Sequence, residues 1–407
     1  MTFVILFIPF MANAFFGKNS TGGTSVIYLD DTRIKIDGGF IEWYDSAEIS
    51  VRGKGVETTI NVDNSSSNEV RSFNVSVNNI NPEITKILGL SEKEIKKEKN
   101  SISFPVKVEA NKVAVYKLTP ELPKDEFMFM VFGESRGGPN VFQRIIGDIN
   151  YRKPLFAISC GDMVEKPSSS DYKDFMKQIN SVTVPFLTVA GSSEILGGNR
   201  RLYEDFLGSP YYSFDFMNSH FIIVDNGDNR ISEDQFLWLE NDLMQNKSIN
   251  TFVFMHMPPY DPRPGKEHPM KLGEQFRRLS AILEKYKVSR VFTAGVHGYY
   301  KKDQGGVPYI ITGGGGSELV SLDSFYNYVL VDVKGDKVKD KLIKLTFPPL
   351  GWYDSLKVKV KLSLKNSFTT HPILSSFAAL ICLFVLFSVL KLFRRRFSRR
   401  TKRRLSL

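Results

Sequence analysis

The chain has 407 residues, of which 42% are hydrophobic and 24% charged, a composition typical of a globular protein with room for two domains. Its formal net charge is +10, but nine Lys and Arg residues lie between Lys391 and Arg404 with no acidic residue among them. Removing these nine leaves +1 for the rest of the chain, which excludes a general nucleic-acid-binding surface.

The N-terminus begins with an apolar run, Met1–Phe16, that contains the small-x-small pattern Ala12-Asn13-Ala14. The run is too short to span a bilayer, and its end is typical of a signal-peptidase cleavage site. No Lys or Arg precedes the apolar residues, so a buried N-terminal strand is the alternative interpretation. We expect residues 1–14 to be a signal peptide.

Residues 25–120 contain runs in which apolar residues alternate with polar ones. Phe73, Val75 and Val77 share one parity, and Ile102 and Phe104 begin a second such run. Short alternating runs separated by Gly and Asn clusters predict an all-β, sandwich-like accessory domain. A charged insertion at residues 82–100 interrupts the pattern and is predicted to be helical. No residue in this domain points to a chemical function.

Residues 126–347 change to apolar runs that alternate with helical patterns, which predicts an α/β layered domain. A capping box at Ser232–Gln235 predicts a helix through Leu243, and Phe276, Leu279 and Leu283 form the apolar face of another. The candidate strands are Phe127–Phe132, Leu155–Ser159, Pro185–Ala190, Phe221–Asp225, Thr251–Met255, Val291–Thr293 and Tyr309–Thr312, with a closing hairpin of Tyr326–Val333 and Leu342–Phe347.

Five loops after these strands carry polar residues of the kinds that bind metal ions. In chain order the loops supply Glu134 with Arg136, then Asp162, Glu194, His256 and His297. The carboxyl ends of parallel strands meet at one edge of a sheet, so these side chains could converge. Carboxylates and imidazoles hold zinc, manganese or iron, and two such ions can activate a water and grip a phosphoryl group.

This ordered set of loops resembles the calcineurin-like metallophosphoesterases, which include purple acid phosphatases and cyclic-nucleotide phosphodiesterases. The resemblance covers about Glu126–Phe347 and extends to connecting segments such as His220–Asp228 and Phe252–Gly265. It implies two packed mixed β-sheets flanked by helices, a two-metal site at the loop rim and a phosphate-ester substrate. It also implies that Asp162 is the carboxylate that bridges the two metals.

The loops depart from the pattern of that family at several positions. The first loop, usually GDxH or GDSR, has Glu134 and Arg136. The third loop has Ser192 and Ser193 in place of an Asn ligand and a His that assists catalysis. In the last loop, Gly295 replaces one of two histidines.

These losses limit the number of metal ions that the site could hold. One ion would keep Glu134, Asp162 and His297, whereas the other would keep only Asp162 and His256. Three protein ligands and a water can hold a catalytic zinc, but two ligands rarely hold any ion tightly. We therefore expect at most one divalent ion (Mn, Fe or Zn), with an empty site as the alternative.

Each of these candidate residues has a structural alternative. Asp162 could cap a turn, and His256 could bond to a backbone carbonyl. Glu134 could form an ion pair with Arg136 instead of binding a metal. Arg136 could alternatively hold a phosphate oxygen of the substrate, because a guanidinium group suits bidentate contacts with anions.

The C-terminal part of the chain is predicted to anchor the protein in a membrane. Residues 348–371 form a juxtamembrane linker, within which Leu356–Leu364 alternates like a one-sided strand. Residues 373–393 are apolar and, at 21 residues, long enough for one transmembrane helix. The basic tail, residues 394–407, would lie in the cytoplasm and the N-terminal ectodomain outside it.

Two functions are compatible with the sequence. The first is a membrane-anchored extracytoplasmic phosphoesterase that cleaves a phosphomonoester or phosphodiester with metal-activated water. The second is a catalytically inactive protein of the same fold that binds a ligand or partner at the membrane surface. The predicted partners are a phosphate ester or surface ligand and the lipid bilayer, and not nucleic acid.

Overall fold

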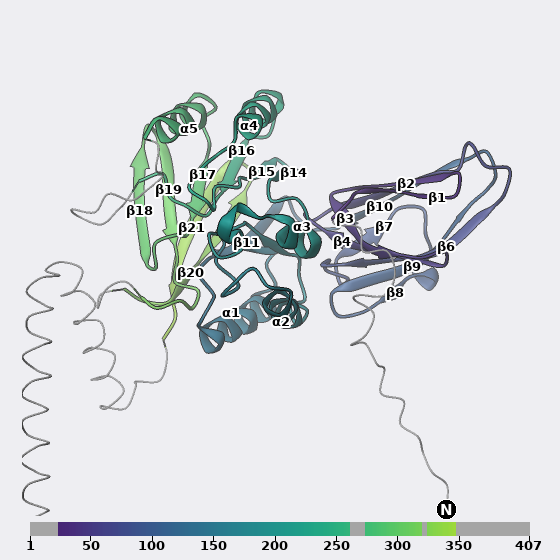
Figure 1. Cartoon of the computed structure of the whole chain (residues 1–407), viewed down its shortest axis with the longest axis horizontal. Coiled ribbons are helices and arrows are strands. Elements are labelled where there is room, and N and C mark those ends of the chain that lie inside the picture. Colours follow the sequence, from purple (N-terminus) through teal and green to yellow (C-terminus); the bar gives the residue numbers. More distant parts are fainter. Residues whose placement is uncertain (1–22, 261–272, 320–323, 347–407) are drawn as a thin grey trace, which may run out of the picture. The chain divides into compact units, whose positions relative to one another are not determined.

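The computed structural model describes residues 23–260, 273–319 and 324–346 (Figure 1). The predicted signal peptide (1–14), linker (348–371), transmembrane helix (373–393) and tail (394–407) lie outside the described residues and stay predictions. Within the described ranges, no helix combines the length and the apolar character needed to cross a membrane. The described residues 23–319 and 325–345 belong to one compact unit.

The N-terminal β-domain consists of two five-stranded sheets. One has the order β1 (Val26–Leu29), β2 (Thr32–Asp37), β5 (Thr58–Asp63), β10 (Val113–Pro120), β7 (Thr85–Ile87). The other has the order β3 (Gly39–Tyr44), β4 (Glu48–Gly53), β6 (Arg71–Asn78), β9 (Ser101–Val108), β8 (Lys96–Lys97). The expected alternation is confirmed, because Val75, Val77, Ile102 and Phe104 point into the core that the two sheets share.

The prediction that the insertion at residues 82–100 is helical is wrong. It contains β7, a single 3₁₀ turn at Glu92–Glu94 and the short strand β8. In β7, Thr85 and Ile87 are buried while Lys86 is exposed, which is the period of a strand. The abundant charged residues of the segment are at the surface and therefore do not indicate a helix.

The second domain has two mixed sheets and five α-helices among the described residues. The first sheet has the order β13 (Phe186–Thr188), β12 (Phe156–Ser159), β11 (Glu126–Phe132), β20 (Asn327–Lys334), β21 (Lys337–Lys344). The second has the order β14 (Tyr212–Phe216), β15 (Ser219–Ile223), β16 (Asn250–Phe254), β17 (Arg290–Thr293), β19 (Val307–Thr312), β18 (Tyr299–Gln304). The expected α/β class and mixed sheets are confirmed.

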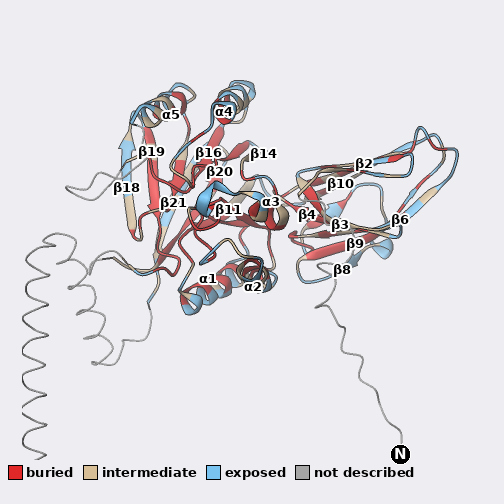
Figure 2. Cartoon of the chain, in the orientation of Figure 1, coloured by how far each residue is buried: buried red, intermediate tan, exposed pale blue. Residues whose placement is uncertain are grey.

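Aromatic side chains fill the space between these two sheets. Phe129 and Phe156 of the first sheet stack at 5.1 Å between ring centroids, and Phe129 meets Phe252 of the second sheet at the same distance. All three rings are fully buried. Figure 2 shows β11 and β16, which carry Phe129 and Phe252, coloured as buried over much of their length. Aromatic contacts of this kind bury large apolar areas, so this layer rigidly supports the strand ends that carry the loops.

Helices cover the outer faces of both sheets (Figure 1). The helices α1 (Pro139–Arg152) and α2 (Ser169–Ile179) pack on the first sheet, whereas α4 (Glu233–Gln245) and α5 (Gly273–Lys285) pack on the second. The predicted N-cap of α4 is confirmed, since the Ser232 hydroxyl accepts the Gln235 N–H at 3.2 Å. A short helix, α3 (Arg201–Leu207), connects β13 with β14.

Parallel pairing brings the important loops to common edges. β11, β12 and β13 are parallel neighbours, and β15, β16, β17 and β19 are parallel in the second sheet. The loops that carry Glu134, Asp162 and Glu194 therefore leave one sheet at the same edge, and those with His256 and His297 leave the other. This arrangement places the predicted site residues within reach of one another.

Candidate metal site

Two glycine–acid turns form the centre of the site. Gly133-Glu134 follows β11 and Gly161-Asp162 follows β12, and the Glu134 N–H donates to the Gly161 carbonyl at 3.0 Å. Both acids adopt positive φ, +62° for Glu134 and +56° for Asp162, a conformation uncommon outside glycine. Both carboxylates are buried, at 1% and 2% exposure. Strained backbone at two adjacent buried acids is typical of a functional site.

His256 joins the two acids to form a cluster of possible metal ligands. Its Nε2 lies 3.5 Å from Asp162 Oδ1 and 3.9 Å from Glu134 Oε1. The candidate ligand atoms of the three residues all lie within 4.8 Å of one another. The other ring nitrogen, Nδ1, lies 2.8 Å from the Cys160 carbonyl, to which it can donate. His256 therefore has the structural bond that the sequence allowed and a free nitrogen directed at the acids.

His297, the fourth predicted ligand, contacts only one of the acids. Its Nε2 lies 2.9 Å from Glu134 Oε2, and its Nδ1 contacts the Glu318 carbonyl. The three-ligand set expected from the sequence was Glu134, Asp162 and His297. Among the described residues, the set that the structure brings together contains His256 in place of His297.

Arg136 pairs chiefly with Asp162 rather than with Glu134. Its Nη2 lies 3.0 Å from Asp162 Oδ2, whereas its Nε lies 4.0 Å from Glu134 Oε2. The carboxylate pair thus has two sides, which we call the His256 side (Oδ1 and Oε1) and the Arg136 side (Oδ2 and Oε2). The ion pair that the sequence suggested is present, but its closer partner is the carboxylate of the second loop.

The third loop supports Asp162 through hydrogen bonds. The Ser193 N–H donates to Asp162 Oδ1 at 2.9 Å, and the Ser192 hydroxyl lies 3.1 Å from the same oxygen. The Ser193 hydroxyl donates to Glu194 at 3.2 Å and is buried. These serines therefore act as hydrogen-bond donors around Asp162, where the family pattern has an Asn ligand and a His.

Glu194 has a role that the sequence did not indicate. Its carboxylate is fully buried and accepts backbone N–H groups from Asp162, Met163, Val164 and Gly191 at 2.7–2.9 Å. Burial and the neighbouring Asp162 raise the pKa of Glu194, and the backbone donors oppose that rise. Glu194 fixes the backbone of the Asp162 turn and is not one of the clustered ligand atoms.

Opposite charges within the cluster shift the pKa values of its carboxylates and histidines. Burial alone would raise the pKa of Asp162, but His256, the Ser193 N–H and Arg136 together bring it below the usual value. Burial would lower the pKa of His256, but the Asp162 and Glu134 carboxylates raise it overall. Glu134 likewise raises the pKa of His297 against the effect of burial. Protons on the histidines and a metal ion would therefore compete for the same carboxylates.

The residues on the His256 side fit one divalent cation. Two carboxylates and one imidazole form a ligand set suited to zinc, manganese or iron, and a fixed ring nitrogen on His256 favours binding. A second site has little support. Gly295 has no side chain, its φ is +60°, and a Cβ there would lie 2.9 Å from Pro258 Cδ.

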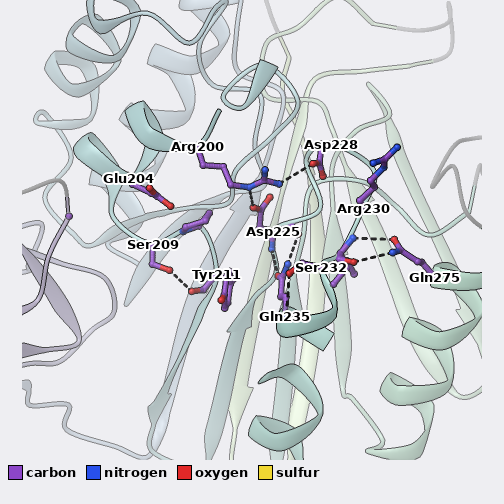
Figure 3. A pocket seen from close by; sticks show the side chains of 13 residues that line it. Arg200, Glu204, Ser209, Tyr211, Asp225, Asp228, Arg230, Ser232, Gln235 and Gln275 are labelled. Atoms are coloured by element: carbon purple, nitrogen blue, oxygen red, sulfur yellow. Dashed lines mark hydrogen bonds and ion pairs between the residues drawn. The ribbon is translucent and has the colours of Figure 1, made fainter. Parts of the chain in front are cut away.

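The described residues also form a pocket that is separate from this cluster (Figure 3). It has a volume of about 680 Å³ and is lined by residues of α3, α4 and the loop after β15, with Arg200 paired to Asp225 and Asp228. None of the predicted site residues lines it. Asn226 in the same loop accepts the His256 N–H at 3.0 Å, so this loop positions the metal-site histidine. The sequence signal for Asn226 was its place directly after a buried strand.

Comparison with known proteins identifies the domain that carries this cluster. Residues 128–299 match the family model described as calcineurin-like phosphoesterase. This stretch of the chain is therefore similar to the calcineurin-like phosphoesterases, as the resemblance of its loops predicted.

Individual relatives match shorter stretches. Purple acid phosphatase 13 of Arabidopsis thaliana is 35% identical over 121 residues, which is 26% of this chain and 22% of that protein. A probable glycerophosphodiester phosphodiesterase of Arcobacter nitrofigilis is 25% identical over 154 residues, 33% of this chain and 53% of that protein. The chain thus spans a minor part of one relative and about half of the other. A purple acid phosphatase structure from yellow lupin seeds gives a TM-score of 0.47 at 15% identity, covering 71% of this chain and 70% of that one.

Proposed function

We propose that this chain is a phosphoesterase with a single divalent metal ion held by Glu134, Asp162 and His256. The observation that carries the proposal is the convergence of their three buried candidate ligand atoms within 4.8 Å. A divalent ion in such a site supplies a metal-bound hydroxide and a Lewis acid for phosphate-ester hydrolysis. Members of the matched family typically depend on such ions, and the substrate class is a phosphomonoester or phosphodiester.

Arg136 and Ser135 are placed to receive the substrate phosphate. Both line a cavity of about 260 Å³ next to the cluster, and the Arg136 side chain is 32% exposed. A guanidinium has five N–H donors, so donors remain after its contact with Asp162. The Ser135 hydroxyl is buried and has no hydrogen-bond partner among the described residues. In this proposal Arg136 binds a phosphate oxygen and the Ser135 hydroxyl bonds to the ester group.

The proposal also places the phosphoesterase domain outside the cytoplasm on a membrane anchor. Its support comes from the sequence: a signal-like N-terminus, an apolar stretch at residues 373–393 and a basic tail at residues 394–407. Protease added to intact cells should then digest the β-domain, and alkaline washing should leave the chain in the membrane fraction. Protection of the β-domain from the protease would argue for the opposite orientation.

The second candidate is a catalytically inactive binding protein of the same fold. The observation that favours it is the hydrogen bonding of Asp162, whose carboxylate already meets Ser192, Ser193 and Arg136. The replacement of two family residues by Ser192 and Ser193, and of a third by Gly295, points the same way. In this case the rim of the domain would bind a ligand or partner at the membrane surface.

Metal content and turnover, measured on the same preparation, distinguish these candidates. The detergent-purified full chain would be tested for bound metal and for hydrolysis of aryl phosphate mono- and diesters with Mn, Fe or Zn. We expect one ion per chain and turnover, with both lost in Asp162→Asn and kept in the exposed control Asp303→Asn. Absence of both metal and turnover in the unmodified chain would reject the enzyme and leave the binding protein.

A further inference from the structure

We propose that the guanidinium group of Arg136 takes the place of a second metal ion, so that this site pairs one metal ion with one fixed protein cation. The inference rests on the metal site proposed above and specifies how many ions it accepts. It concerns the Arg136 side of the carboxylate pair, which consists of Asp162 Oδ2 and Glu134 Oε2.

The two sides of the carboxylate pair have different partners. On the His256 side, Asp162 Oδ1 and Glu134 Oε1 face an imidazole nitrogen at 3.5 and 3.9 Å. On the Arg136 side, Asp162 Oδ2 and Glu134 Oε2 face a guanidinium at 3.0 and 4.0 Å, and Glu134 Oε2 also lies 2.9 Å from His297 Nε2. A bridging carboxylate in a two-metal site gives one oxygen to each ion. Here the second oxygen of Asp162 is directed at a cation that belongs to the chain.

The backbone of Arg136 is fixed at both of its polar groups. Its N–H donates to the Asp162 carbonyl at 3.1 Å, and its carbonyl accepts the Ser317 hydroxyl at 3.0 Å. The following residue, Gly137, has φ of +68°, and a Cβ there would lie 2.9 Å from Glu165 Oε1. These contacts hold the base of the side chain directly beside Asp162. The guanidinium is therefore already in position before any ligand binds.

A second ion on this side would have to displace contacts that the chain already makes. Glu134 Oε2 lies 2.9 Å from His297 Nε2. Asp162 Oδ2 lies 3.2 Å from the Ser192 hydroxyl as well as 3.0 Å from Arg136 Nη2. His297 reaches Glu134 but is not part of the group of clustered ligand atoms with Asp162. A divalent ion bound to Asp162 Oδ2 would also lie within about 4 Å of the guanidinium and be repelled by it. Arg136 neutralises these oxygens instead.

Metal-binding measurements on the full chain test this role without relying on activity. The metal-stripped chain would be titrated calorimetrically with Mn²⁺ and with Zn²⁺, and bound metal would be counted after desalting. The variants are Arg136→Ala, Arg136→Gln and Arg136→Lys, with Arg144→Ala on the exposed face of α1 as the matched control. Thermal unfolding of each variant verifies that it is folded. If Arg136→Ala does not fold, Arg136→Gln still removes the charge and the test remains valid.

We expect removal of the charge to change the affinity for metal or the number of ions. Arg136→Ala and Arg136→Gln should bind a second ion, or bind the first more tightly by about tenfold or more. Arg136→Lys and Arg144→Ala should behave like the unmodified chain. An unmodified chain without metal whose Arg136→Gln variant binds metal would support this inference while rejecting the proposed enzyme. Equal stoichiometry and affinity in all variants would overturn it, and Arg136 would be only an ion-pair partner of Asp162.

Discussion

The carboxylate of Glu194 accepts the backbone N–H of Asp162 at 2.8 Å, so that one buried acid holds the backbone of another. The same carboxylate accepts the next two N–H groups, those of Met163 and Val164, at 2.7 and 2.9 Å. The left-handed turn at Asp162 is therefore maintained by a side chain 32 residues further along the chain. This bond links the third loop of the site to the second, independently of any metal.

Replacement of Glu194 by Gln should destabilise the protein and weaken metal binding. An amide has one accepting oxygen, so two of the four backbone N–H groups lose their acceptor in a buried place. We expect a loss of roughly 2–4 kcal/mol in the free energy of unfolding, measured by chemical denaturation. We also expect metal affinity to fall by about tenfold or more, because supporting bonds orient the ligands. Glu165→Gln, at an exposed position near the same turn, should change neither quantity.

Gly295 cannot be converted into a metal ligand by substitution alone. Its φ of +60° disfavours any side chain, and a Cβ would lie 2.9 Å from Pro258 Cδ and 3.1 Å from Met257 Sδ. Gly295→His should therefore cost about 2 kcal/mol or more of unfolding free energy. The number of bound ions should not rise.

The matched control for that substitution is Gly306→His in the turn between β18 and β19. Gly306 has φ of +77°, and a Cβ there would meet nothing within 4 Å. Its cost should be that of the backbone conformation alone, about 1 kcal/mol. Equal costs at both positions, or a second ion in Gly295→His, would contradict the view that the last loop has lost its capacity for a second site.

Much of the architecture could be predicted because burial leaves a periodic signal. The alternation in β6 and β9, the apolar strands β12 and β16 and the Ser232 N-cap of α4 all appear in the structure as expected. The reciprocal bond of the predicted capping box does not form, because the Gln235 side chain bonds to the backbone of Asp225. Strand β18 was missed because it is an edge strand with exposed residues at Lys301, Lys302 and Asp303, and thus has no apolar face to recognise. Strand β14 was missed as well, although it pairs with β15.

The candidate site was predicted less completely than the fold. Residue type and position after a strand were sufficient to select Glu134, Asp162, His256 and His297. The grouping of His256 with the two acids depends on the left-handed turns at Glu134 and Asp162 and on the bond from His256 to the Cys160 carbonyl. Loop backbone angles and long-range hydrogen bonds do not produce a periodic pattern. For the same reason the roles of Glu194 and Asn226 were not apparent.

Asn79 makes long-range hydrogen bonds at the edge of the first sheet that likewise leave no periodic pattern in the sequence. Its side chain accepts the Phe186 N–H at 2.7 Å and donates to the Phe186 carbonyl at 3.1 Å, as a neighbouring strand would. It also donates to the Gly53 carbonyl at 2.9 Å. The amide of a residue in the N-terminal β-domain thus completes the bonding of the edge strand β13.

Asn79→Ala should lower the free energy of unfolding by about 2 kcal/mol or more, because the Phe186 N–H and two carbonyls lose their buried partners. Asn79 also has positive φ, at +60°, so the control must carry the same backbone cost. Asn111, with φ of +56° on an exposed turn, meets this condition. Asn111→Ala should cost clearly less in the same denaturation experiment, and equal costs would show that backbone strain, not the bonds to Phe186, is responsible.

His220 should make the stability of the protein depend on pH. Its ring lies between two carboxylates, with Nδ1 at 2.6 Å from Asp215 and Nε2 at 2.8 Å from Asp242. Burial would lower the pKa of His220, but the bonds to Asp242 and Asp215 raise it above the usual value of a histidine. A group whose pKa is higher in the folded state than in the unfolded state stabilises the folded state. This contribution to the free energy of unfolding is complete at pH values below the unfolded-state pKa, and it is lost as the pH rises through the folded-state pKa.

His220→Gln should therefore be less stable than the unmodified chain by on the order of 1 kcal/mol at pH values below 6.5, a modest figure because Asp215 is largely exposed. The difference should shrink as the pH is raised above the folded pKa of His220. Urea unfolding across this pH range measures the difference, and NMR titration of the His220 ring in Asp242→Asn should show a lowered pKa. A stability difference that stays constant with pH would mean that His220 contributes by packing rather than by its charge.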